Sequence, residues 1–140
     1  MIWFCAPEGP RPARGSFPFP PVLRTTMTLI FKIVASDEWR AADTAGTFAG
    51  AAVDRADGYI HFSTAAQAPE TAARWFAGRR DLTLVAVDAD AVGADLRWEP
   101  SRGGALFPHL YAPLRMSAVR WSRPLPLAPD GRHDFGGLGG

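Results

Sequence analysis

The sequence predicts an α+β fold in which two helices pack on a mixed or antiparallel sheet. Short apolar runs typical of strands recur along the chain, whereas only two segments show helical periodicity. Two helices are too few for a doubly wound parallel sheet, because each parallel connection needs about a dozen residues and usually a helix. We therefore expect a strand, a helix, a strand and a helix in this order, followed by strands alone.

The first strand is expected at residues 29–33, which form a short apolar run. A helix follows at residues 36–46, where apolar side chains recur at helical spacing up to a glycine. Residues 47–56 are expected to form a loop. This loop should approach the cleft, since Asp54 and Asp57 bracket the start of the next strand.

The second helix is expected to begin in a capping box, because Thr64 and Gln67 have the spacing that satisfies the first helical amides. Gly78 is well placed to end this helix. Its buried face is expected to contain Ala72, Trp75 and Phe76. Four tryptophans are interpreted as core side chains: Trp39, Trp75, Trp98 and Trp121.

Residues 82–88 show the strongest strand pattern, and apolar side chains on both faces predict a central position in the sheet. Two further strands, residues 96–99 and 106–112, are expected to flank a loop at residues 101–104. A last strand is expected at residues 117–125. These three strands complete the expected sheet.

The chain of 140 residues is long enough for one domain with its own core, and its formal net charge is +1. No basic face or polybasic run stands out, so nucleic acid is not an expected partner. No segment approaches the roughly 18 apolar residues of a membrane span. The single cysteine, Cys5, excludes an intrachain disulfide, and a reducing, cytoplasmic setting is expected.

Residues 1–26 differ from the rest of the chain, because they contain many prolines and glycines and no periodicity. We expect a disordered extension or a translated leader here, with the natural start at Met27. Residues 27–135 are interpreted as a single globular domain, and residues 136–140 as a frayed tail.

The segment Asp-Gly-Tyr-Ile-His-Phe-Ser-Thr (57–64) predicts a turn and then a strand whose polar face contains Tyr59, His61 and Ser63. Thr64 caps the following helix, whose N-terminal amides would favour a phosphate or carboxylate. His61 is therefore a candidate for ligand binding or acid–base chemistry. The alternative is a strand histidine that is hydrogen-bonded to the backbone.

The segment Phe-Pro-His-Leu-Tyr (107–111) has the same alternation and presents His109 and Tyr111 on one face. If the two strands line one cleft, His109 is an acid–base partner and Tyr111 a stacking platform. Tyr111 lies between apolar neighbours and equally fits the edge of a core. The single-cleft hypothesis fails if His61 and His109 lie on opposite sides of the sheet.

The loop at residues 101–104 offers a second candidate feature. Its glycines, Gly103 among them, permit a ligand to approach the backbone, and Arg102 supplies a bidentate donor for phosphate or carboxylate. The same glycines fit a simple hairpin loop. Glu99 is a candidate general base or ribose ligand, or a partner of Arg97 or Arg102 in a surface ion pair.

Two other chemistries are not predicted. His61, His109 and an aspartate could supply metal ligands, but no spacing such as His-x-x-x-His is present. Ser63 lacks the Gly-x-Ser-x-Gly elbow of a serine hydrolase.

Together these motifs resemble the bacterial domain-of-unknown-function family 952, over residues 27–135. The resemblance rests mainly on His-Phe-Ser-Thr (61–64) and Phe-Pro-His-Leu-Tyr (107–111), with Trp-Glu (98–99) and Ser-Arg-Gly-Gly (101–104). It implies the ADP-ribosylation fold, with a split, bent sheet and a cleft that holds NAD in relatives. The family itself has no established activity.

The resemblance also implies positions for a nucleotide site. Ser63 and Thr64 look like the Ser-Thr element of the arginine-type transferases, and Lys32 falls near a cationic or histidine residue on their first strand. Neither a His-Gly-Thr motif nor a Glu-x-Glu pair is present, so Glu99 is the only nearby acid that could replace the catalytic glutamate.

The leading hypothesis is a protein that binds NAD or a related nucleotide in the cleft. Such a protein would be an ADP-ribosyl- or phospho-transferase, or a domain derived from one. The candidate catalytic residues are His61, Glu99 and His109. The candidate nucleotide-binding residues are Lys32, Ser63, Thr64, Arg102, Gly103 and Tyr111. The alternative is a non-catalytic module that binds a small metabolite or a protein partner, which the missing transferase acids favour. RNA end processing is a third hypothesis, opposed by the absence of a basic surface.

Overall fold

The computed structural model describes residues 28–136 and 138. The extension expected at residues 1–26, and residues 137, 139 and 140 of the expected tail, lie outside this range. Within the described residues, no helix is long and apolar enough to cross a membrane.

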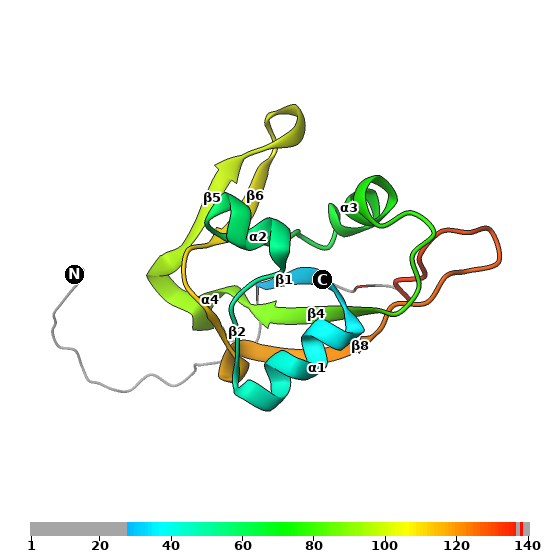
Figure 1. Cartoon of the computed structure of the whole chain (residues 1–140). Helices are drawn as coiled ribbons and strands as arrows, with labels where there is room; N and C mark the ends of the chain where they lie inside the picture. The colour runs from blue at the N-terminus through cyan, green and yellow to red at the C-terminus, as the bar shows by residue number, and fades with distance from the viewer. Residues whose placement is uncertain (1–27, 137, 139–140) are drawn as a thin grey trace, which may run out of the picture.

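The structure combines helices and strands along the whole described chain (Figure 1). In order, the elements are β1 (Leu29–Ala35), α1 (Ser36–Ala45), β2 (Thr47–Phe48), α2 (Ala52–Asp57), β3 (Ile60–His61), α3 (Ala68–Trp75), β4 (Leu82–Asp88), α4 (Ala89–Val92), β5 (Leu96–Pro100), β6 (Leu106–Leu110), β7 (Leu114–Arg115) and β8 (Val119–Pro124). Short 3₁₀ turns lie at Gly93–Asp95, Arg102–Gly104 and Met116–Ala118.

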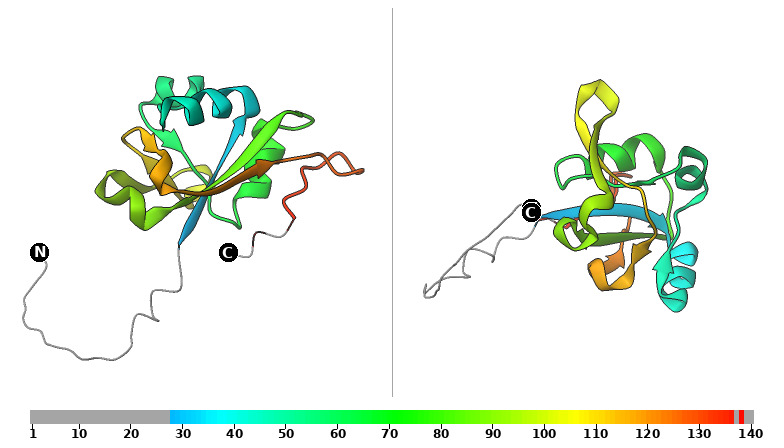
Figure 2. Two further views of the ribbon diagram at one scale, coloured as in Figure 1. Left: turned by 90° about the horizontal axis from the view of Figure 1, so that it is seen from below. Right: turned by 90° about the vertical axis from the view of Figure 1, so that its left-hand side faces the viewer.

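The named strands pair in three antiparallel sheets, ordered β1-β4-β8, β2-β7 and β3-β6-β5 (Figures 1 and 2). The α+β class is therefore confirmed, and β4 is central in its sheet, as its apolar pattern predicts. A bridge between Phe31 of β1 and Ser63, with reciprocal N–H···O bonds of 2.8 Å, joins the first sheet to the third. This bridge fixes β1 beside the strand that contains His61.

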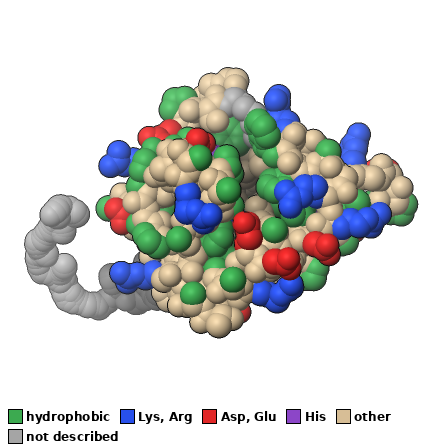
Figure 3. All heavy atoms as spheres, in the orientation of Figure 1, with side chains coloured by type: hydrophobic (Ala, Val, Ile, Leu, Met, Phe, Trp, Pro, Cys, Tyr) green, Lys and Arg blue, Asp and Glu red, His purple; other side chains and the backbone are tan. Residues whose placement is uncertain are grey.

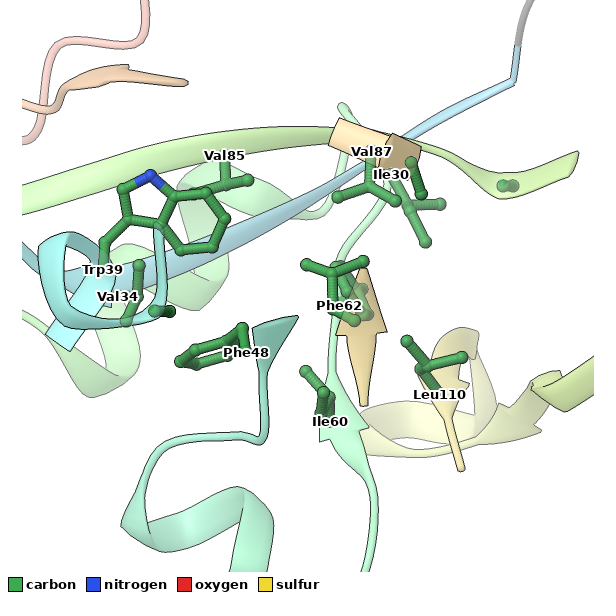
Figure 4. Packing of buried hydrophobic residues seen from close by; sticks show 13 residues of the cluster. Ile30, Val34, Trp39, Phe48, Ile60, Phe62, Val85, Val87 and Leu110 are labelled. Atoms are coloured by element: carbon green, nitrogen blue, oxygen red, sulfur yellow. The ribbon is translucent and has the colours of Figure 1, made fainter. Parts of the chain in front are cut away.

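The two faces of β1 enter two different cores, because side chains alternate along a strand. Ile30 and Val34 join a cluster whose members come from all three sheets and from α1 (Figure 4). Phe31, on the opposite face, packs in a second cluster that includes Ala72 of α3. Lys32 shares the face of Ile30 and Val34, so it is directed into the molecule and is 5% exposed.

The predicted capping box before α3 is confirmed. The main-chain N–H of Thr64 donates to Oε1 of Gln67 (3.0 Å), and the N–H of Gln67 donates to Oγ1 of Thr64 (3.2 Å). Nε2 of Gln67 also donates to the main-chain oxygen of Leu106 at 2.8 Å. The start of α3 is thereby tied to β6.

The expectation of only two helices and of a loop at residues 47–56 is wrong. That segment contains β2 and most of α2. The four-residue helix α4 lies where a turn or a short helix was expected, at residues 89–95. The helix α2 has six residues and too few turns to show apolar periodicity. Its first turn is stabilised instead by Asp54, which accepts a hydrogen bond from the N–H of Ala51 at 2.8 Å.

The expectation that four tryptophans fill the core is wrong for two of them. Trp75 is 66% exposed on α3 and Trp98 is 41% exposed on β5. Of the three residues predicted for the buried face of this helix, only Ala72 is buried, and Phe76 is partly buried. Trp39 is buried, and Trp121 packs against Phe31 with ring centroids 6.0 Å apart.

Candidate functional site

His61 of β3 and His109 of β6 are direct cross-strand partners. Opposite residues on neighbouring strands project from the same face of a sheet. The two imidazole rings accordingly meet edge to face, with centroids 5.6 Å apart. Arg97 of β5 pairs with His109 on its other side, so the row continues onto a third strand. The two histidines therefore lie on one side of the sheet, as the single-cleft hypothesis requires.

Tyr59 lies among these rings. Its ring stacks on His109 with centroids 4.1 Å apart and contacts His61 at 4.6 Å and Tyr111 at 5.2 Å. The guanidinium carbon of Arg97 lies 4.9 Å from the centroid of Tyr111, which is a cation–π contact. We use the name histidine–tyrosine cluster for Tyr59, His61, Arg97, Glu99, His109 and Tyr111.

Asp54 of α2 anchors His61 from the inside of the molecule. Its Oδ1 atom accepts hydrogen bonds from the ring Nδ1 (2.6 Å) and from the main-chain N–H (3.1 Å) of His61. Nζ of Lys32 lies 3.0 Å from Oδ1 and 2.9 Å from Oδ2 of the same carboxylate. Asp54 is 1% exposed, so a buried ion pair supports the histidine.

The carboxylate of Asp54 is ionised at neutral pH. Burial pushes the pKa of Asp54 up, but the hydrogen bond from His61 and the charge of Lys32 outweigh it and lower the pKa from 3.8 to about 2. Burial lowers the pKa of Lys32, and the carboxylate of Asp54 opposes that effect. Lys32 was expected to bind a nucleotide, but the structure directs its ammonium to Asp54.

The second ring nitrogen of His61 contacts Asp57, the last residue of α2. The distance from Nε2 to Oδ2 of Asp57 is 3.0 Å, at the surface, where the Asp57 side chain is 47% and the His61 side chain 33% exposed. An ionised carboxylate accepts hydrogen bonds and donates none. Both contacts of His61 are therefore hydrogen bonds only when both ring nitrogens carry protons.

Glu99 of β5 anchors His109 in a similar way. Its Oε1 atom lies 2.8 Å from Nδ1 of His109 and accepts a hydrogen bond from the Tyr111 hydroxyl at 2.6 Å. The bond from Tyr111, followed by that from His109, lowers the pKa of Glu99. The same bond to Glu99 raises the pKa of Tyr111. Glu99 thus belongs to the histidine–tyrosine cluster as the acceptor for both side chains.

Three other predicted residues, Ser63, Thr64 and Gly103, lie apart from these contacts. Ser63 is 5% exposed, with Oγ 2.9 Å from Oγ1 of Thr71, and Thr64 bonds reciprocally to Gln67 in the turn before α3. Arg102 and Gly103 belong to the turn between β5 and β6, where Gly103 adopts a left-handed φ of 66°. A Cβ at Gly103 would meet nothing within 4 Å. That geometry fits a hairpin loop, and it also leaves the backbone accessible.

Two supporting residues were not recognised from the sequence. Asp54 was placed only near the cleft, and its pairing with Lys32 spans 22 positions, a separation that no spacing rule marks. Gly50 has a φ of 109°, and a Cβ there would lie 2.9 Å from Cβ of Asp54. Only glycine therefore leaves room for the buried carboxylate in its present position.

The structure offers no metal site among the described residues, and its open hollow lies away from the histidine–tyrosine cluster. Within residues 28–136 and 138, no group of three or more His, Cys, Asp or Glu side chains could hold a metal ion. An open hollow at the ends of β1 and β4 contains no member of the histidine–tyrosine cluster. Its lining residues are Ser36, Asp37, Arg40, Asp81, Leu82, Pro124, Leu125 and Pro126.

The fold and the site define a small α+β protein with antiparallel sheets and two histidines, each bonded to a carboxylate through Nδ1. The family model described as "Protein of unknown function (DUF952)" matches residues 33–122, and the chain belongs to this family. The family resemblance drawn from the sequence motifs is thus confirmed.

Solved structures of protein CC0527 from Caulobacter crescentus are similar to this chain. The crystal structure is 54% identical, with a TM-score of 0.75, and the match covers 78% of this chain and 96% of that one. The solution NMR structure is 56% identical, with a TM-score of 0.69 and coverage of 76% and 91%. No curated protein matches the chain.

Proposed function

We propose that the protein binds NAD or a related nucleotide at the histidine–tyrosine cluster. The observation that carries this proposal is the carboxylate of Glu99 among the rings of Tyr59, His109 and Tyr111. The nicotinamide ring of oxidised NAD is flat and positively charged, and aromatic faces beside a carboxylate attract such a ring. Arg97 already makes a contact of this kind with Tyr111, which is 39% exposed.

The ADP-ribosylation fold implied by the sequence motifs supports the same class of ligand, because its cleft holds NAD in relatives. A shared fold does not transfer activity, so catalysis needs its own argument. In an ADP-ribosyl transfer, Glu99 would stabilise the positive charge that develops on the ribose. His61 and His109, each oriented through Nδ1 by a carboxylate, would then be the acid–base groups.

A non-catalytic module that binds a small metabolite or a protein partner at the same place is the second candidate. It is favoured by the contacts of the two histidines. Both ring nitrogens of His61 lie against carboxylates, and His109 is 5% exposed. Groups arranged in this way position a ligand more readily than they exchange protons with it.

RNA end processing is the least favoured of the original hypotheses. The rings of His61 and His109 touch edge to face, which leaves no room for a phosphate between them. On the face drawn in Figure 3, Lys and Arg side chains are interspersed with Asp and Glu. Binding to a phosphate backbone depends on clustered positive charge, which that face does not offer.

Calorimetric titration with NAD, ADP-ribose and nicotinamide tests the proposal. We expect saturable binding of NAD or ADP-ribose that Glu99→Gln and His61→Ala each weaken about tenfold, the loss of one charged hydrogen bond. His133→Ala is the matched control, because His133 bonds to the main chain of Arg79 and is outside the cluster. Undiminished binding by both cluster variants, or no saturable binding at all, would contradict it. Nicotinamide release during the titration would separate an enzyme from a binding module.

A further inference from the structure

We infer that Nε2 of His61 is an anion-binding position, and that Asp57 occupies it as a displaceable internal substitute for a phosphate or carboxylate group of the ligand. The inference rests on the proposed function, since it names the ligand group that His61 takes. Pyrophosphate oxygens of a nucleotide have the required chemistry, and so does free phosphate.

The orientation of His61 is fixed from one side only. Asp54 bonds both Nδ1 and the main-chain N–H of His61, and Asp54 is itself held by Lys32 in the interior. Rotation of the imidazole would break the 2.6 Å bond to Asp54. Nε2 is therefore preorganised to face the surface, as a binding position needs to be.

The contact between His61 and Asp57 is exposed and weakly held, in contrast to the buried contact with Asp54. Among the described residues, the bond to His61 is the one hydrogen bond of the Asp57 side chain. The carboxylate is 47% exposed and lies at the C-terminal end of a six-residue helix. Exposed ion pairs of this kind contribute little, so an incoming anion can replace Asp57 at small cost.

The charges around His61 also allow one anion to bind beside its Nε2 atom in place of Asp57. The groups that face its ring are Asp54 and Asp57 of α2 and the rings of Tyr59 and His109. Asp54 is neutralised by Lys32 at 2.9 Å. Once the Asp57 side chain turns into solvent, Nε2 of His61 has no acceptor from the protein. The negative charge of the Asp57 carboxylate is then also removed from the imidazole, so an anion can take its place.

Titration with inorganic phosphate tests this inference without any nucleotide. We expect Asp57→Ala to bind phosphate about fivefold more tightly than the unaltered protein, measured by the shift of the imidazole signals in NMR spectra. Asp37→Ala is the matched control, since it removes a carboxylate that is 88% exposed and pairs with Arg40 in α1. We expect the control to bind phosphate like the unaltered protein. Adding His61→Gln to Asp57→Ala should abolish the gain.

Three results would overturn the inference: equal or weaker phosphate binding by Asp57→Ala, an equal gain in Asp37→Ala, or a gain that survives His61→Gln. Nucleotide binding without the phosphate gain would overturn this inference and leave the proposed function standing. The phosphate gain without any nucleotide binding would support the anion position and contradict the proposed function.

Discussion

Asp54 is the residue on which the site depends, because one buried carboxylate meets the ammonium of Lys32, the ring and main chain of His61, and the N–H of Ala51. Each oxygen accepts more than one polar contact, so the desolvation of the charge is offset in several directions. The orientation of His61 follows from this arrangement. The consequences can be measured at single residues.

Asp54→Ala should destabilise the protein strongly, because it leaves the Lys32 ammonium buried without its partner. We expect the free energy of unfolding to fall by about 3–5 kcal/mol in urea denaturation. The double variant Lys32→Met with Asp54→Ala removes both charges and should lose less than the sum of the two single variants. Strictly additive losses would show that the two side chains do not act as a pair.

Stability should fall in acid because of the same carboxylate. The pKa of Asp54 is lowered from 3.8 to about 2 by folding, so its contribution is present above about pH 4 and is lost as the pH falls to about 2. The part lost is about 2 kcal/mol, from roughly 1.4 kcal/mol for each pKa unit. Urea denaturation at several pH values checks this. Asp54→Ala should lack this part of the acid sensitivity, and an unchanged pH profile in the variant would contradict the assignment.

Tyr111→Phe should raise the pKa of Glu99, because the hydrogen bond from Tyr111 is the largest influence that lowers it. Carbon-13 NMR of the glutamate carboxyl during a pH titration measures the change. Tyr59→Phe is the matched control, since it removes the other tyrosine hydroxyl and retains the bond between Tyr111 and Glu99. A Glu99 pKa that stays unchanged in Tyr111→Phe would rule out this bond in solution.

At the scale of the elements, the connection between β2 and α2 determines where Asp54 lies. Gly50 lies in this connection and has a φ of 109°. Gly46, which ends α1 before β2, also has a positive φ, of 91°, and serves as the comparison. A Cβ at Gly46 meets nothing within 4 Å, whereas one at Gly50 lies 2.9 Å from Cβ of Asp54. We expect Gly46→Ala to cost about 1–2 kcal/mol for the backbone alone. Gly50→Ala should cost clearly more in urea denaturation, and equal costs would contradict the steric argument.

Some elements can be predicted from the sequence and others cannot. The central strand β4 was predicted because residues 82–87 are apolar except for Thr83, and the structure buries all six. The capping box in the turn before α3 was predicted because Thr64 and Gln67 have a fixed spacing. The helix α2 is too short to show a period, and β3 is paired over only two residues. The exposure of Trp75 depends on which face of α3 meets the sheet, which the spacing alone did not decide.

At the scale of the whole molecule, the site exists because three segments far apart in the chain meet. Antiparallel pairing places His61 opposite His109, and the bridge from Phe31 to Ser63 places Lys32 of β1 beneath them. Alternation along each strand predicted that each histidine shares a face with a tyrosine. The register between strands and the depth of Asp54 come from tertiary packing, so the sequence could not predict that the histidines are bonded to carboxylates.

The central claim is that the histidine–tyrosine cluster binds a nucleotide, and a titration of NAD followed by the NMR signals of the aromatic rings tests it most directly. We expect Tyr59, His109 and Tyr111 to shift together and saturate, while the exposed ring of Trp75 on α3 stays unchanged. The absence of any saturable shift would contradict the claim. So would saturable shifts that leave these three rings unaffected and instead involve the hollow beside Ser36 and Asp81.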